Sequence, residues 1–184
     1  NNPSSNNERV IDVAIDSNNN IIIAGYDNSS VNYQFRVEKL NSSGSNIWNY
    51  TNDPGPNTDY AESIAVDSNN NILIAGYDKS PTGPEAQFRV EKLNSSGSNL
   101  WNYTSNPSSS TDDWAEAVAV DSNNNIIVVG SAGYPNEQWR VEKLNSSGTN
   151  LWNYTYDMSA DRDSTEGVKV DSNNNILVVG FDSV

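Results

Sequence analysis

Residues 64–77, IAVDSNNNILIAGY, decide the fold of this chain. A short apolar run leads into the polar sequence Asp-Ser-Asn-Asn-Asn, and a second apolar run follows at once and reaches a glycine. Two apolar runs joined by a tight polar turn are typical of an antiparallel β-hairpin. Close copies of this hairpin occupy residues 13–26, 118–131 and 168–181, so the chain is built from repeats of about 50 residues.

A second hairpin lies between successive copies of the first. Residues 87–104, QFRVEKLNSSGSNLWNYT, have near copies at residues 34–51 and 138–155. Each full repeat therefore predicts four strands in an antiparallel meander. The turns need residues that tolerate positive φ, which are asparagine in the first hairpin and glycine in the second. These residues are Asn19, Asn70, Asn124 and Asn174, and Gly44, Gly97 and Gly148.

The apolar pattern indicates how the hairpins pack. Ile64 and Val66 share one face of the first strand, Ala65 lies on the other face, and the second strand is apolar on both. Sheets buried on both faces at a fixed period are typical of propeller blades, each of which lies between two neighbours. The sequence predicts an all-β chain, a β-propeller of four-stranded antiparallel blades. About three and a half blades are present, at about 9–58, 59–112 and 113–163, with a half blade at 164–184.

The paired motifs VDSNNNI and KLNSSG resemble the extracellular β-propeller repeat families of bacteria and archaea and, more distantly, NHL repeats. The resemblance runs from Val10 to Phe181. It implies the propeller fold and an extracellular or cell-surface location, but no particular activity. The chain has four copies of the first hairpin but three of the second. This count favours the interpretation that the chain is a piece of a longer ring. Subunits that complete one another, and a four-bladed ring with an incomplete last blade, stay open.

Composition excludes several classes of function. The formal net charge of -14 predicts no nucleic-acid partner and no attraction to anionic membranes. The chain has neither cysteine nor histidine, which excludes zinc, haem and iron–sulfur sites, a cysteine nucleophile and a Ser-His-Asp triad within it. No apolar stretch approaches the roughly 20 residues that span a bilayer, so we expect no membrane insertion.

Acidic residues gather in the variable segments before each first hairpin. The candidates for binding calcium or another cationic ligand are Asp59, Glu62, Asp113, Glu116, Asp163 and Glu166. The alternative is an acidic rim that keeps a repetitive β-protein soluble and discourages pairing between edges. The DSNNN turn begins like a calcium loop, but isoleucine replaces the glycine at its sixth position, and a plain hairpin turn explains it better.

The second hairpin carries further repeated features. Arg36 with Glu38, and their copies, predict structural ion pairs on one strand face. Trp48, Trp101 and Trp152 predict packing anchors between blades. Candidate N-glycosylation sequons follow the asparagines of the turns and of the last strands: Asn41, Asn94, Asn145, Asn49, Asn102 and Asn153. Turn asparagines are the ones we expect to be exposed enough for modification.

The leading functional hypothesis is a non-catalytic extracellular module, a secreted or cell-surface scaffold, adhesion or recognition element with a protein or carbohydrate ligand. One alternative is a structural subunit that self-associates through the open edge of the last hairpin by β-strand donation. The other is a propeller glycosidase or polysaccharide lyase with paired carboxylates and Tyr60 or Trp114 as a sugar platform. Because the carboxylates recur in every repeat, whereas catalytic sites usually break repeat symmetry, we expect no enzyme.

Overall fold

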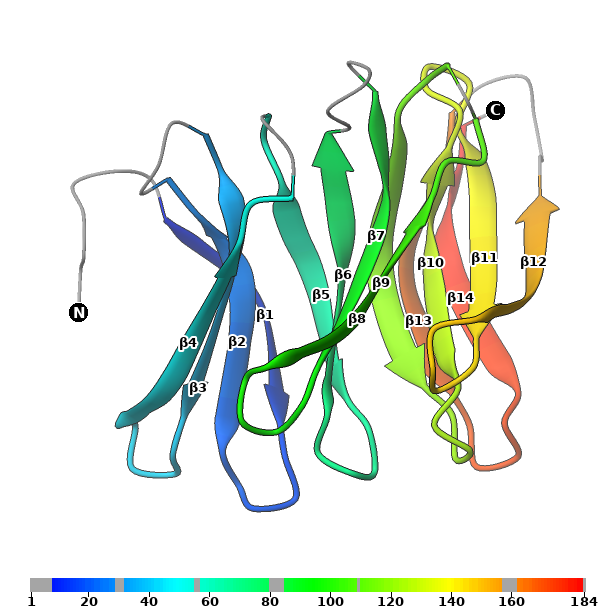
Figure 1. The fold of residues 1–184 in the computed structure, drawn as a ribbon. Coiled ribbons are helices and arrows are strands. Elements are labelled where there is room, and N and C mark those ends of the chain that lie inside the picture. Colours follow the sequence, from blue (N-terminus) through cyan, green and yellow to red (C-terminus); the bar gives the residue numbers. More distant parts are fainter. Residues whose placement is uncertain are drawn as a thin grey trace.

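The computed structural model of the protein describes residues 8–28, 32–54, 57–79, 85–108, 110–156 and 162–183. These residues form fourteen strands (Figure 1). The strands are β1 Arg9–Ile15, β2 Ile21–Asp27, β3 Gln34–Leu40, β4 Asn46–Asn52, β5 Tyr60–Val66, β6 Ile72–Lys79, β7 Ala86–Leu93, β8 Asn99–Ser105, β9 Asp113–Val120, β10 Ile126–Ala132, β11 Gln138–Leu144, β12 Asn150–Tyr156, β13 Asp163–Val170 and β14 Ile176–Asp182. Within the described ranges, no helix is both long and apolar enough to cross a membrane.

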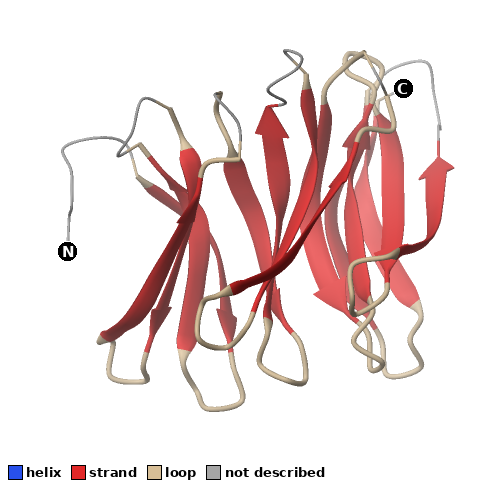
Figure 2. Cartoon of the chain, viewed as in Figure 1, coloured by secondary structure: helices blue, strands red, loops and turns tan. Residues whose placement is uncertain are grey.

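The strands form three four-stranded antiparallel sheets, β1–β4, β5–β8 and β9–β12, and a two-stranded sheet, β13–β14 (Figure 2). The first strands of successive sheets, β1, β5, β9 and β13, lie next to one another and form the inner side of the array. The prediction of an all-β propeller with three and a half blades is confirmed. Asp163, which we placed at the end of the third unit, is the first residue of β13.

Tight β-turns join the strands at one end of the array, and longer connections lie at the other (Figure 1). The four turn asparagines have φ between 58° and 64°, as predicted, and Gly44, Gly97 and Gly148 also have positive φ. In the β5–β6 turn, the carboxylate of Asp67 accepts hydrogen bonds from the backbone N–H groups of Asn69 and Asn71. Its Oδ2 lies 2.9 Å from Nζ of Lys92. The aspartate of the DSNNN motif therefore stabilises the hairpin turn.

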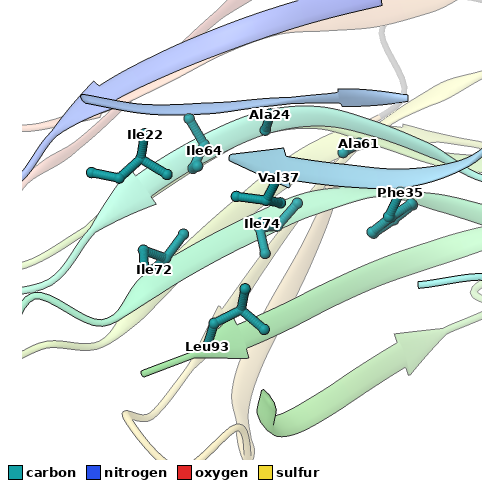
Figure 3. Close-up of a cluster of buried hydrophobic side chains, with 9 residues drawn as sticks. All are labelled: Ile22, Ala24, Phe35, Val37, Ala61, Ile64, Ile72, Ile74 and Leu93. Atoms are coloured by element: carbon teal, nitrogen blue, oxygen red, sulfur yellow. The ribbon is translucent and has the colours of Figure 1, made fainter. Parts of the chain in front are cut away.

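Apolar side chains pack between successive blades. Figure 3 shows the cluster between the first two, in which Ile22 and Phe35 of one blade meet Ile64, Ile72 and Ile74 of the next. On the opposite face of β6, Leu73 and Ala75 join the equivalent cluster with the third blade. The continuous apolar run of each second strand is thereby explained, because both of its faces are covered.

Hydrogen bonds between a turn serine and the turn asparagine of the next blade recur at each blade boundary, and we call this contact the serine–asparagine lock. The backbone N–H of Ser17 donates to Oδ1 of Asn70 at 3.0 Å, and Nδ2 of Asn70 donates to Oγ of Ser17 at 2.8 Å. The pairs Ser68–Asn124 and Ser122–Asn174 repeat the first of these bonds, and Ser68–Asn124 repeats the second as well. One turn residue thus fixes its own hairpin and the preceding blade.

The second hairpins hold their neighbours as well. Arg89 and Glu91 form the predicted ion pair at 2.7 Å, and Glu91 also accepts a hydrogen bond from the Tyr50 hydroxyl of the preceding blade at 2.8 Å. Nε1 of Trp48 donates to the carbonyl oxygen of Ser95 across the same boundary. The prediction of structural ion pairs is confirmed. Trp48 and Trp101 are anchors between blades as predicted, whereas Trp152 is 41% exposed.

Candidate functional site

A β-bulge positions one glutamate on each of three inner strands. The pairing of β5 with β6 shifts between Ala61 and Ser63, so Glu62 is the extra residue. Glu116 in β9 and Glu166 in β13 stand at the same shift. Bulges re-aim a side chain and are frequent beside functional sites.

The glycine of each second strand makes the bulge possible. A Cβ atom built on Gly76 would collide with the carbonyl oxygen of Tyr60, and one on Gly130 would collide with that of Trp114. Only glycine allows the first strand to approach this closely. In the second, third and fourth repeats, the Ala-Gly or Val-Gly step is therefore linked to the placement of the glutamate.

Two of the glutamates share a pocket on the side of the longer connections. The pocket has a volume of about 240 Å³ and is lined by Glu62, Tyr77, Trp114 and Glu116. It lies between the second and third blades, where two inner strands run side by side. Paired carboxylates flanked by aromatic rings form a surface that suits a sugar ring.

Hydroxyl groups surround Glu116. Its Oε1 accepts hydrogen bonds from Oγ of Ser131 at 3.2 Å and from Oγ of Ser164 at 3.1 Å, and its Oε2 accepts one from Oγ1 of Thr165 at 2.9 Å. Burial raises the pKa of Glu116 to about 7, against these hydrogen bonds, and the charge of Glu166 acts in the same direction. A carboxyl group with this pKa is present in both protonation states at neutral pH.

Glu62 has a different environment. Burial raises its pKa above the ordinary value, and the positive charge of Arg9 opposes that shift. Arg9 therefore favours the ionised form of Glu62, while Glu166 favours the protonated form of Glu116. Environments that act differently on two neighbouring carboxyl groups prepare one to donate a proton and the other to accept one.

A continuous row of aromatic rings passes the pocket. Ring centroids of Tyr60 and Tyr77 are 5.1 Å apart, and those of Tyr77 and Trp114 are 6.4 Å apart. The row extends to Tyr134 beyond Trp114 and, through Tyr26, to Tyr33 at its other end. Aromatic faces bind the apolar faces of sugar rings, so the row offers several adjacent binding positions.

The predicted aspartates lie apart from this pocket. Asp59, Asp113 and Asp163 are fully buried. Asp113 accepts hydrogen bonds from the backbone N–H groups of Ser108 and Gly133, and Asp59 accepts one from that of Lys79. Glu166 is exposed. Of the six acidic candidates, the structure brings Glu62 and Glu116 together and uses at least two of the aspartates to hold connections.

Among the residues that the structure describes, no group of three or more acidic side chains is arranged to hold a metal ion. Calcium binding stays a prediction. The sequons differ from our expectation. The turn asparagine Asn41 is half-buried, and its Oδ1 accepts hydrogen bonds from Ser43 and Ser45, a pattern that Asn94 and Asn145 repeat. The strand asparagines Asn49, Asn102 and Asn153 are the exposed ones.

Sequence analysis missed Tyr77, Ser131, Ser164 and Thr165. Tyr77 had a signal, because it ends the ILIAGY run directly after the glycine that the bulge requires. The three hydroxyl residues had none. They meet Glu116 from two other strands, and only the packing of the third blade on the half blade brings them together.

Residues 50–77, from the end of the first blade to β6, match the SBBP family, described as a β-propeller repeat. The chain is a β-propeller repeat protein. No curated protein matches it.

Several solved structures are similar to the chain, among them the following three. A gluconolactonase from Xanthomonas campestris is 13% identical with a TM-score of 0.55, and the match covers 93% of this chain and 54% of that one. Sqt1 from Chaetomium thermophilum is 10% identical with a TM-score of 0.54, covering 95% and 41%. A third protein, described as a gluconolactonase, is 14% identical with a TM-score of 0.50, covering 95% and 60%. This chain thus spans about half the length of the propellers that it matches.

These comparisons correct our leading functional hypothesis. We expected a non-catalytic scaffold, adhesion or recognition element, yet two of the three similar structures are named as enzymes and none as an adhesion protein. The identities are low, so the likeness itself establishes the fold.

Proposed function

We propose that the pocket between the second and third blades is the catalytic site of a carbohydrate hydrolase. The observation that carries the proposal is Glu116, whose pKa is raised to about 7 in a pocket shared with Glu62 and two aromatic rings. The names of two structural neighbours, which are gluconolactonases, support a sugar as substrate. The bond cleaved is a C–O bond at C1 of the sugar, which is the anomeric bond of a glycoside or the acyl C–O bond of a sugar lactone.

Each carboxyl group has a role in this reaction. Protonated Glu116 donates its proton to the departing oxygen, and ionised Glu62 accepts a proton from the attacking water molecule. In a glycoside, the water oxygen bonds to the anomeric carbon as the old C–O bond breaks. In a lactone, it first adds to the carbonyl carbon, and the acyl C–O bond then breaks. Glu116 is then ionised and Glu62 protonated, and proton exchange with solvent restores the starting state.

The hydroxyl groups around Glu116 act after the proton has left. Ser164 and Thr165 donate hydrogen bonds to the carboxylate that forms, so they stabilise the product state without transferring the proton themselves. Trp114 and Tyr77 hold the sugar ring against the two carboxyl groups. Tyr60, adjacent to Tyr77 in the aromatic row, extends the platform for a second sugar unit.

The test is hydrolysis of two substrate panels, aldonolactones and aryl glycosides, by the protein and by Glu116→Gln. General acid–base catalysis contributes about 100- to 10,000-fold, so we expect the variant to lose at least about 100-fold in kcat/KM. Glu166→Gln is the matched control, since Glu166 occupies the same bulge position outside the pocket. It retains activity, and its rate profile moves to slightly lower pH, because burial still raises the pKa of Glu116 and only the smaller contribution from the charge of Glu166 is gone.

Whichever panel is hydrolysed identifies the substrate class. Equal rates for Glu116→Gln and the unchanged protein would refute the catalytic role of Glu116. Binding of sugars with no turnover in either panel would refute the enzyme and leave a lectin-like site.

A further inference from the structure

The two end faces of the array are apolar and exposed, although the same repeat positions are buried inside it. Leu73 and Ile127 face the next blade and are 0% exposed, whereas their counterpart Leu177 in the half blade is 53% exposed. Ala75 and Val129 are 0% exposed, and their counterpart Val179 is 61% exposed. We call this surface of β14 the forward face.

The opposite end shows the complementary pattern. Ile64 and Val118 face the preceding blade and are 6% and 7% exposed, whereas their counterpart Val13 is 57% exposed. Val10 in the same strand is 59% exposed, although Ala61, at its repeat position, is fully buried. We call this surface of β1 the backward face. Inside the array, forward positions pack only on backward positions.

Each end of the array also carries one partner of the serine–asparagine lock, the serine at one end and the asparagine at the other. In the interior, a turn serine binds the turn asparagine of the next blade. Among the described residues, no blade precedes Asn19 to supply that serine, and none follows Ser172 to supply that asparagine. The two ends therefore carry the two halves of one lock.

Charge adds to this complementarity. Glu116 meets Ser164 in the next blade, and by the repeat Glu166 corresponds to Glu116 while Arg9 corresponds to Ser164. A first blade placed after β13–β14 would therefore bring an arginine to Glu166. Both side chains are exposed in the single chain. Lys169 departs from the interior pattern, since it replaces an alanine, and it can cover apolar surface with its aliphatic stem.

We propose that the forward face of one copy of this chain binds the backward face of a second copy, head to tail. The half blade of one copy then packs on the first blade of the other as neighbouring blades pack within the chain. This contact does not depend on the proposed activity.

The experiment measures solution mass by light scattering over a concentration range. The unchanged chain shows a rise with concentration to at least twice the monomer mass. Val13→Glu blocks the backward face and Val179→Glu blocks the forward face, so each variant alone is monomeric. An equimolar mixture forms a one-to-one dimer, because each variant contributes its intact face. Leu100→Glu, on the exposed side of β8, is the control and associates like the unchanged chain.

Circular dichroism checks that both variants are folded, as expected for substitutions at exposed positions. A monomeric mass of the unchanged chain at every concentration would overturn the proposal and assign the two faces to a different partner. Association of Val13→Glu alone would overturn it too, since it would indicate edge-to-edge pairing of β14 with β14. A mixture that stays monomeric while the unchanged chain associates would exclude the head-to-tail arrangement.

Discussion

Leu73→Ala, compared with Leu177→Ala, tests how the blades are stabilised. The two leucines occupy the same position of the repeat, but Leu73 is fully buried between the second and third blades and Leu177 is 53% exposed. Truncation of a buried leucine costs about 2–5 kcal/mol, from lost burial and from the cavity left behind. An exposed truncation stays within about 0.5 kcal/mol.

Urea unfolding followed by tryptophan fluorescence measures the difference. With a denaturant slope of about 1–3 kcal/mol per molar urea, Leu73→Ala lowers the midpoint by about 1 M or more. Leu177→Ala shifts it by less than about 0.5 M at protein concentrations where the chain is monomeric. Equal destabilisation by both substitutions would refute the reasoning, because the outer face of β14 would then be covered within a single chain.

Three further predictions concern single positions. Asp67→Asn leaves Lys92 buried without its charge partner and should cost about 3–5 kcal/mol in urea unfolding. Asp171→Asn, in an exposed copy of the same turn, should lower the unfolding midpoint far less. Gly130→Ala places a Cβ atom against a backbone carbonyl and should lower stability by about 1–3 kcal/mol and disturb the bulge, which hydrogen exchange would detect. Folding raises the pKa of Glu116 from 4.5 to about 7. The stability that protonated Glu116 contributes is therefore present below about pH 4.5 and is lost as the pH rises through 7. Thermal unfolding across this range should show a decline in stability that Glu116→Gln lacks.

The repeat made much of the fold predictable from the sequence. Asn70 and Gly97 were identified as turn residues with positive φ because their conformations depend on neighbours a few residues away. The apolar pattern of Ile64, Ala65 and Val66 identified two buried faces, since a strand places alternate residues on opposite sides.

The site was less predictable, because it depends on register and on packing between blades. Asp59 and Glu62 looked alike in the sequence. The bulge, however, turns Glu62 toward a pocket, whereas Asp59 is buried directly before β5 and accepts a hydrogen bond from the backbone of Lys79. The raised pKa of Glu116 results from burial against strands of the third blade and the half blade, which no local pattern records.

The protonation state of Glu116 decides whether this carboxyl group can act as a general acid near neutral pH. Carbon-13 NMR of side-chain carboxyl groups, assigned by comparison with Glu116→Gln, gives its pKa with and without a bound sugar. We expect a midpoint near pH 7 that moves when a sugar or sugar lactone occupies the pocket. A midpoint near the ordinary 4.5, unchanged by sugar, would contradict this expectation and leave Glu116 as a solvated carboxylate on the inner strand.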